Sequence, residues 1–118
     1  DSPIRVSKTN KKREAVLCTG FPSAYEFRPN REQTVESIYS EYLKVRMLGS
    51  AAMSLAYVAR GSIDVYWEDH IKLWDVAAGI ALVQAAGGSV GCSKIDEDFI
   101  LSVEAGASSH LLPKGVTE

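Results

Sequence analysis

One acidic residue, Asp75, stands at the head of a long apolar segment and is the most informative residue of the chain. The segment runs from Val76 to Ala86 and stops at Gly87-Gly88, a pair that typically ends a helix. Apolar residues occupy all sides of the helical wheel, so we predict a buried helix. An acid at its first turn faces the positive end of the helix dipole, which favours the carboxylate. The simplest structural interpretation of Asp75 is the N-cap of this helix.

Several separate blocks of sequence resemble the inositol monophosphatase family, at a spacing that holds over nearly the whole chain. They are Ile4–Thr9, Cys18-Thr19-Gly20-Phe21-Pro22, Arg46–Ala59, then Gly61, Asp64, Tyr66 and Glu68, followed by Trp74-Asp75 and Ala86-Gly87-Gly88. The resemblance implies a mixed sheet layered with helices and a metal-dependent phosphatase.

The family's first half carries a glutamate pair and an Asp-Pro-(Ile/Leu)-Asp-Gly-Thr motif, which bind most of the metal ions and the phosphate. This sequence contains no Asp-Pro, Asp-Gly or Glu-Glu pair. The resemblance therefore implies that residues 1–118 form one domain, the C-terminal α/β half of such an enzyme, with the N-terminal metal-binding half absent. We expect this chain alone to be inactive.

The resemblance also assigns the candidate site residues. Asp75 is one metal ligand, and its carboxylate suits Mg²⁺, a hard cation that prefers oxygen. Glu68 hydrogen-bonds a substrate hydroxyl; its structural alternative is a solvated loop acid. The triplet Gly49-Ser50-Ala51 stands at a helix start where small residues let backbone amides approach the substrate. A close-packed helix start explains the triplet equally well, and both roles can hold together.

Four further residues fit the family pattern less closely. Lys72 lies three residues before Asp75, where it could reach a phosphate, although an exposed lysine is the commoner case. Arg46 matches a family arginine near the subunit contact and is interpreted as structural. His70 and His110 have no partner that the sequence identifies. Family members often carry Gly or Met where Asp69 and His70 stand, so the alcohol group of the substrate stays open.

Composition describes an ordinary globular domain and excludes several classes of function. The 118 residues are 46% hydrophobic and 24% charged, and the net charge of −2 gives no basic field for nucleic acid. The longest apolar run is too short and interrupted to span a membrane. Cys18 and Cys92 match no disulfide framework or zinc motif, and Cys18 is predicted to be a buried thiol. We expect a cytoplasmic protein.

Hydrophobic patterning predicts strands alternating with helices, which indicates an α/β fold with a mixed β-sheet layered with helices. The predicted strands are 15–19, 45–48, 63–67, 89–92 and 99–103, with a short edge strand at 4–6. The predicted helices are one starting at Pro29-Asn30 and reaching Leu43, one at 51–60 capped by Ser50, the Asp75 helix, and a short one at 106–112. Residues 21–28, 68–73 and 113–118 are predicted to be loops or a tail.

Three functions remain open on the sequence. The first is the C-terminal part of a Mg²⁺-dependent phosphatase acting on phosphate monoesters of small polyols, such as inositol monophosphate. The second is a catalytically silent domain that acts only through association, and the third is a sugar-bisphosphate or nucleotide phosphatase of the same fold. A domain that lacks its other half would expose an apolar surface, so we expect a partner: its own N-terminal half or another copy.

Overall fold

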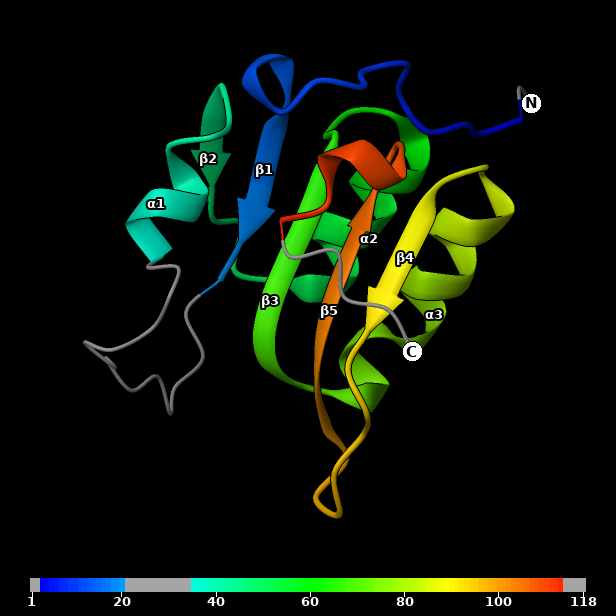
Figure 1. Cartoon of the computed structure of the whole chain (residues 1–118). Helices are drawn as coiled ribbons and strands as arrows, with labels where there is room; N and C mark the ends of the chain where they lie inside the picture. Colours follow the sequence, from blue (N-terminus) through cyan, green and yellow to red (C-terminus); the bar gives the residue numbers. More distant parts are fainter. Residues whose placement is uncertain (1–2, 21–34, 114–118) are drawn as a thin grey trace.

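The computed structural model describes residues 3–20 and 35–113 and shows one mixed β-sheet with helices on both faces (Figure 1). Its strands are β1 (Val16–Thr19), β2 (Lys44–Arg46), β3 (Val65–Lys72), β4 (Ser89–Cys92) and β5 (Ile100–Gly106). Its helices are α1 (Val35–Tyr39), α2 (Ala51–Arg60) and α3 (Leu73–Ala85), with two 3₁₀ turns, η1 (Lys12–Glu14) and η2 (Ser109–Leu111). The predicted α/β class is confirmed.

The sheet has the order β2-β1-β3-β5-β4. Strands β2, β1 and β3 are parallel, whereas β5 runs antiparallel to both β3 and β4. Strand β1 ends at Thr19, which pairs with Trp67 in the first half of β3, so β3 continues beyond the carboxyl end of β1. The carboxyl ends of parallel strands are where open α/β sheets usually bind ligands.

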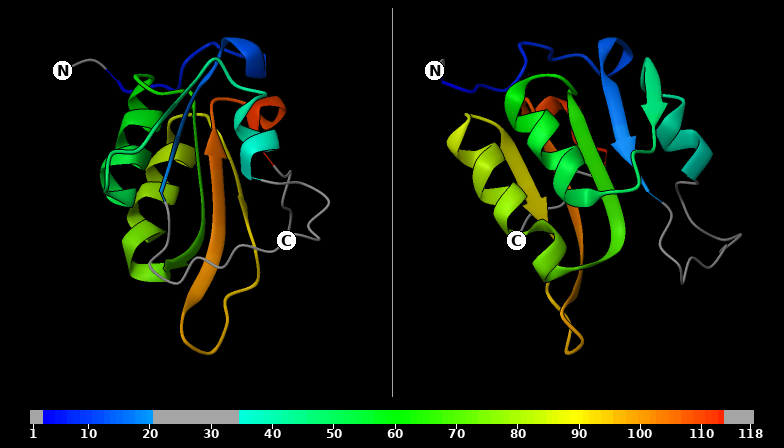
Figure 2. Two further views of the ribbon diagram at one scale, coloured as in Figure 1. Left: turned by 90° about the vertical axis from the view of Figure 1, so that its left-hand side faces the viewer. Right: turned by 180° about the vertical axis from the view of Figure 1, so that it is seen from behind.

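Two hydrophobic cores lie on opposite faces of the sheet, as the edge-on view shows (Figure 2). Helices α2 and α3 cover one face, and α1 and η2 cover the other. Strand β3 serves both cores because its side chains alternate: Tyr66 packs under α2 and α3, whereas Val65 and Trp67 pack under α1 and η2. Both cores therefore fix the position of β3, the strand that leads to Glu68.

The ends of α2 and α3 follow the predicted signals. The Ser50 hydroxyl oxygen accepts a hydrogen bond from the Met53 amide at 3.2 Å, and Gly61 ends α2 in the left-handed conformation. Beyond α3, Gly87 has φ +93°, and the Gly88 amide donates to the Val83 carbonyl at 2.9 Å. The Gly87-Gly88 pair thus ends α3 with a Schellman motif.

Helix α3 differs from its prediction in two ways. It begins at Leu73 with Lys72 as the N-cap residue, so the N-cap interpretation of Asp75 is wrong. It is also not buried all round: its buried residues are Val76, Gly79 and Val83, while most of its other positions, Leu82 among them, are exposed. The described chain supplies packing partners for one side only, which a pattern that is apolar on every side does not reveal.

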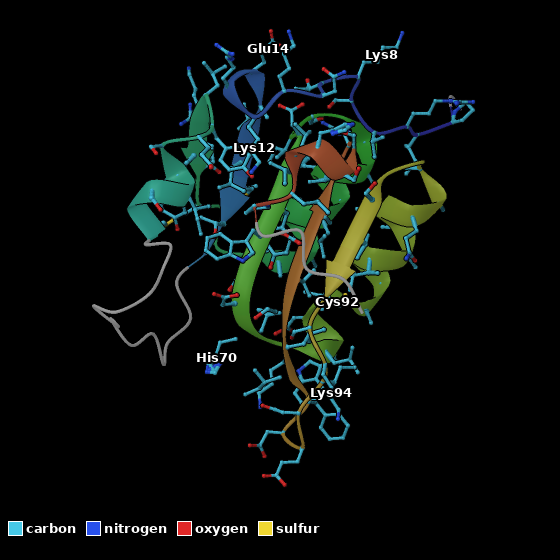
Figure 3. All side chains as sticks on the ribbon, in the orientation of Figure 1. Lys8, Lys12, Glu14, His70, Cys92 and Lys94 are labelled. Atoms are coloured by element: carbon cyan, nitrogen blue, oxygen red, sulfur yellow. The ribbon has the colours of Figure 1, made fainter. Side chains whose placement is uncertain are left out.

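The predicted loop 68–73 is wrong, because β3 continues to Lys72 and stays paired with β5. The register shifts between Glu68 and Ile71, and His70 has φ 59° inside this bulge. Polar residues interrupt the alternation here, which is why the sequence predicted a loop. In Figure 3 the His70 side chain points away from the sheet. Strand β5 likewise runs three residues beyond its predicted end, to Gly106.

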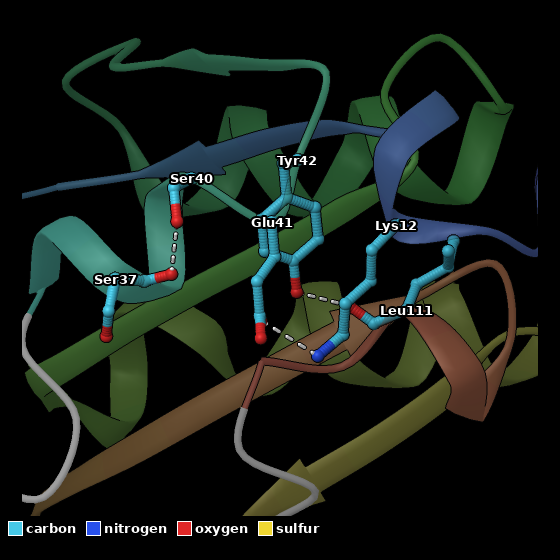
Figure 4. Close-up of polar contacts among 6 residues, drawn as sticks. All are labelled: Lys12, Ser37, Ser40, Glu41, Tyr42 and Leu111. Atoms are coloured by element: carbon cyan, nitrogen blue, oxygen red, sulfur yellow. Dashed lines mark hydrogen bonds and ion pairs between the residues drawn. The ribbon is translucent and has the colours of Figure 1, made fainter.

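On the α1 face, the predicted helix to Leu43 ends at Tyr39 instead, and its predicted start at Pro29-Asn30 lies outside the described residues. Tight turns follow, and the Tyr42 hydroxyl donates to the Leu111 carbonyl at 2.6 Å (Figure 4). Lys12 pairs with Glu41 at 3.1 Å beside it. The chain leaves the helix early because the Leu43 amide bonds the Ala15 carbonyl, which leads into β2.

Smaller predictions had mixed outcomes. Strand β2 occupies 44–46 rather than 45–48, and the predicted helix at 106–112 is the single turn η2. No strand forms at residues 4–6, where the Val6 amide donates a hydrogen bond to the Ala86 carbonyl. The predicted loop 21–28 and residues 114–118 of the predicted tail lie outside the described residues. Cys18 is a buried free thiol, as predicted. Within residues 3–20 and 35–113, no helix has both the length and the apolar character needed to cross a membrane.

Candidate functional site

A cleft of about 650 Å³ opens where β1 and β3 end and where α2 and α3 begin. All five residues predicted for the site line it: Gly49, Ser50, Ala51, Glu68 and Asp75. They come from three elements that are separated along the chain. The cleft is also lined by residues that the sequence analysis did not assign, which are Thr19, Gly20, Met47, Ala52, Ser54, Ile71 and Trp74.

The start of α2 forms one wall of the cleft. Gly49 has φ +76°, a conformation that favours glycine, and it turns the chain into the helix. The Ser50 hydroxyl oxygen is engaged in capping, and the Ser50 carbonyl accepts from the Ser54 hydroxyl at 2.8 Å. Ser54 in turn lies 3.1 Å from the buried Cys18 sulfur, which ties α2 to β1. The close-packed helix start is therefore present, and the backbone amides of this turn remain beside the cleft.

Asp75 is the third residue of α3, and its side chain is exposed to the cleft. Among residues 3–20 and 35–113, it makes no hydrogen bond or ion pair. Its position in the first turn still places it near the positive end of the helix dipole. A carboxyl side chain that makes no hydrogen bond to the described residues, at the edge of a cleft, is available to bind a ligand.

Glu68 lies partly buried on the opposite side of the cleft and accepts a hydrogen bond at Oε1 from the Tyr66 hydroxyl at 2.8 Å. Burial raises the pKa of the Glu68 carboxyl above its ordinary value, and the nearby Asp75 and Asp69 raise it further, while the Tyr66 hydrogen bond opposes them. Burial also raises the pKa of Tyr66, so its hydroxyl stays a donor. Two acids thus face one cleft, and the raised pKa of Glu68 means that ionising its carboxyl there costs stability.

We expect the Glu68→Gln variant to be more stable than the wild type at pH 7. Because the Glu68 pKa is higher in the folded state than in the unfolded state, the contribution of this carboxyl to the free energy of unfolding depends on pH. The contribution is fully present below the unfolded-state pKa, about 4.3, and is lost as pH rises through the folded-state pKa. Glutamine removes this loss and still accepts the Tyr66 hydrogen bond. Urea unfolding at pH 7 and pH 4 measures the difference, which should disappear at pH 4. Glu97→Gln, in an exposed loop, is the control; a less stable Glu68→Gln at pH 7 contradicts the expectation.

The fit of the cleft to a metal ion depends on how many ligands its side chains supply. In the described part of the chain, no group of three or more His, Cys, Asp or Glu side chains is close enough to hold one. The exposed Asp75 carboxylate has the right chemistry for a single ligand of a hard cation, because its oxygens are not used elsewhere in that part. A complete site would need further ligands from residues other than those described.

The four less certain residues lie away from the cleft lining. The Lys72 ammonium donates to the Asp98 carbonyl at 3.2 Å and lies 5.5 Å from the centre of the Trp74 ring. Arg46 is exposed at the end of β2 and bonds the carbonyl of its neighbour Val45. His70 and His110 are both exposed. None of the four is among the residues that line the cleft.

Comparisons with known proteins show which family the chain is similar to. Residues 1–116 match the model of the inositol monophosphatase family. The chain is 37% identical over 97 residues to an inositol-1-monophosphatase of Caulobacter vibrioides, covering 80% of this chain and 36% of that protein. It is 42% identical over 104 residues to an inositol-1-monophosphatase of Synechocystis, covering 80% of this chain and 34% of that protein.

A solved structure shows the same fold. The inositol monophosphatase of Anabaena superposes with a TM-score of 0.77 at 33% identity, over 92% of this chain and 45% of that one. The chain therefore spans between a third and a half of the length of these relatives.

Proposed function

The chain belongs to the inositol monophosphatase family, and we propose that it is the C-terminal part of a Mg²⁺-dependent phosphatase that hydrolyses phosphate monoesters of small polyols. The observation that carries the proposal is the cleft in which Glu68, Asp75 and the start of α2 meet. The cleft combines a possible oxygen ligand for a metal (Asp75), an acceptor for hydroxyl groups (Glu68) and the N-terminus of α2. We also propose that the protein is located in the cytoplasm.

In this proposal each side of the cleft has a separate role. A divalent metal, when bound, neutralises charge on the phosphoryl oxygens and activates water. Asp75 would hold the metal through its carboxylate, together with ligands from the first half of the protein. Glu68 accepts a hydrogen bond from a substrate hydroxyl, and the amides at the start of α2 face an anionic or hydroxyl-bearing group.

The charge of the cleft favours a monophosphate over a bisphosphate or nucleotide. Within the described residues, its lining includes the carboxylates of Glu68 and Asp75 but no lysine or arginine. A second phosphate on the substrate would meet negative charge there without a basic partner. This supports a phosphorylated alcohol as substrate and makes sugar bisphosphates and phosphoadenosine phosphate the alternatives to test.

We expect the 118-residue chain alone to show no Mg²⁺-dependent turnover of inositol 1-phosphate. A fusion of this chain behind the N-terminal part of the Caulobacter relative should hydrolyse it, because the fusion supplies the remaining metal ligands. The assay compares both proteins, with fructose 1,6-bisphosphate and phosphoadenosine phosphate as competing substrates. Turnover by the pure 118-residue chain would show that its own residues suffice. A folded fusion that hydrolyses none of the three contradicts the proposed function and favours the silent domain.

The outer faces of α2 and α3 support the proposed association. Large apolar side chains are exposed on these two helices: Met53 is 48% exposed, Leu82 43%, and Trp74, which also lines the cleft, 65%. Where such side chains form a contiguous patch, they mark an interaction site. Since the chain spans less than half of its relatives, we propose that the N-terminal half of the protein covers these faces, and that a second copy does so when that half is absent.

We therefore expect the isolated chain to form a dimer or larger assembly at micromolar concentration in light scattering. The fusion with the N-terminal part of the Caulobacter relative should bind less of a hydrophobic dye, because the faces of α2 and α3 would be covered. Leu82→Gln in the isolated chain should weaken association, whereas Ser62→Gln, at an exposed site, serves as the control. A clean monomer that binds no dye contradicts the proposal.

A further inference from the structure

The buried Tyr66 hydroxyl donates a hydrogen bond to the Glu68 carboxylate. The two residues are two positions apart on β3, so both side chains lie on the face covered by α2 and α3. Tyr66 is only 1% exposed and is packed among the residues of that core. Its hydroxyl reaches Glu68 Oε1 at 2.8 Å. A rigidly packed ring therefore directs one hydrogen bond at one carboxylate oxygen.

Gly20 leaves the space that the same carboxylate occupies. A Cβ atom at this position would lie 2.9 Å from Glu68 Oε1, closer than real Cβ contacts allow, and 3.1 Å from Oε2, so the carboxylate would have to shift. The φ angle of Gly20 lies outside the left-handed region, so the backbone itself does not require glycine here. The missing side chain is needed for Glu68, whose carboxylate would be displaced by any larger residue.

The backbone alone does not fix Glu68. Strand β1 ends at Thr19, opposite Trp67, so Glu68 has a strand neighbour only on the β5 side. The bulge begins immediately after Glu68. The Thr19 hydroxyl bonds the Trp67 carbonyl at 2.6 Å and is the last tie between the two strands before Gly20. The direction of the Glu68 side chain is thus set by Tyr66 and by the space at Gly20.

We propose that Tyr66 and Gly20 are positioning residues that aim Glu68 at one hydroxyl of the substrate. Tyr66 occupies Oε1, and in the described part of the chain no residue donates a hydrogen bond to Oε2, which leaves that oxygen to the ligand. The pair would then set the preference for phosphate esters that carry a neighbouring hydroxyl. This inference rests on the function proposed above, since it assigns a selectivity to the same cleft.

The kinetic test uses the fusion protein and two substrates, inositol 1-phosphate and p-nitrophenyl phosphate, which has no alcohol hydroxyl. Tyr66→Phe should raise KM for inositol 1-phosphate roughly five-fold, the effect of one lost hydrogen bond, with kcat little changed. The kinetics on p-nitrophenyl phosphate should stay as in the wild type. Gly20→Ala should act in the same direction. Tyr42→Phe, which also removes a buried tyrosine hydroxyl but on the other face of the sheet, is the matched control.

A double-mutant cycle shows whether Tyr66 acts through Glu68. In a Glu68→Ala background, Tyr66→Phe should no longer change KM for inositol 1-phosphate. If Tyr66→Phe still raises KM there, or raises it equally for both substrates, its role is general packing and the proposal is overturned. An unchanged KM for Tyr66→Phe in the wild-type background overturns it as well.

Crystal structures of the 118-residue chain test the positioning without any activity. In Tyr66→Phe and in Gly20→Ala the Glu68 carboxylate should move away from its place beside residue 20, whereas in Tyr42→Phe it should stay. A carboxylate that keeps its place in both site variants overturns the proposal. A wild-type fusion that hydrolyses neither ester contradicts the proposed function instead, and these structures still decide the role of Tyr66 and Gly20.

Discussion

Asp75→Asn is expected to reduce the activity of the fusion protein about 100-fold or more while leaving its stability nearly unchanged. Asparagine keeps one oxygen but loses the negative charge that holds a hard divalent ion. Loss of the metal removes several kcal/mol of transition-state stabilisation, which corresponds to this change in rate. The measurements are kcat as a function of Mg²⁺ concentration and the melting temperature.

In the structure Asp75 contributes little to folding, so Asp75→Asn should change activity without changing stability. Asp75 is not the N-cap of α3, because Lys72 occupies that position. Its carboxylate accepts no hydrogen bond from other described residues, so asparagine loses the interaction of one charge with the helix dipole, about 0.5 kcal/mol. It also removes the repulsion between Asp75 and Glu68, which offsets that loss. Stability and activity should therefore separate. If Asp75→Asn retains full activity at ordinary Mg²⁺ concentration, Asp75 is not a metal ligand.

Two other acids provide the comparison. Asp98→Asn removes an exposed carboxylate in the β4–β5 loop and should change neither rate nor metal dependence. Glu68→Gln should alter substrate choice more than metal dependence, because Glu68 is proposed to bind the alcohol and not the ion. A Glu68→Gln variant that needs far more Mg²⁺, as Asp75→Asn should, contradicts this division of roles.

Local signals in the sequence predicted the elements whose ends are set by neighbouring residues. Helix α2 begins and ends as expected, because Ser50 and Gly61 act within one turn of the helix that they delimit. Strands β1 and β4 also fall close to their predicted limits: Gly20 directly follows β1, and Gly87-Gly88 directly precede β4. The extension of β3 to Lys72 was missed because it depends on pairing with β5, nearly thirty residues later in the chain.

The candidate site was only partly accessible to sequence reasoning. Glu68 and Asp75 were assigned by resemblance to a family, and the fold places them in one cleft, while their roles remain predictions. Tyr66 and Gly20 belong to the sequence blocks that resemble the family, but the resemblance assigned neither of them a role in the site. The contact of Gly20 with Glu68 joins residues 48 positions apart in the printed sequence, and no local pattern encodes it. The period-2 alternation of the predicted strand 63–67, continued by one residue into the predicted loop, places Tyr66 and Glu68 on one face and was the available signal.

The second large effect is expected at Gly79, where α3 packs closely against Leu55 of α2. A Cβ atom at Gly79 would lie 2.5 Å from both Cβ and Cδ1 of Leu55, which is fully buried in α2. Gly79 is one turn beyond Asp75, so this contact sets the distance between the starts of the two helices. The absence of a side chain at Gly79 thus helps determine the width of the cleft between Ser50 and Asp75.

Helix propensity and packing predict opposite signs for Gly79→Ala, which makes the variant informative. Alanine in a helix interior is favoured over glycine by about 1 kcal/mol. Overpacking against Leu55 costs typically 1–3 kcal/mol, and because Leu55 Cβ itself is too close, a rotamer change cannot relieve it. We therefore expect a net loss of stability in urea unfolding and, in the fusion protein, lower activity as α3 shifts. Ala78→Gly, at an exposed position of the same helix, measures the propensity effect alone. A Gly79→Ala variant that is more stable than the wild type shows that α2 and α3 can separate without cost, and the close approach then does not fix the cleft.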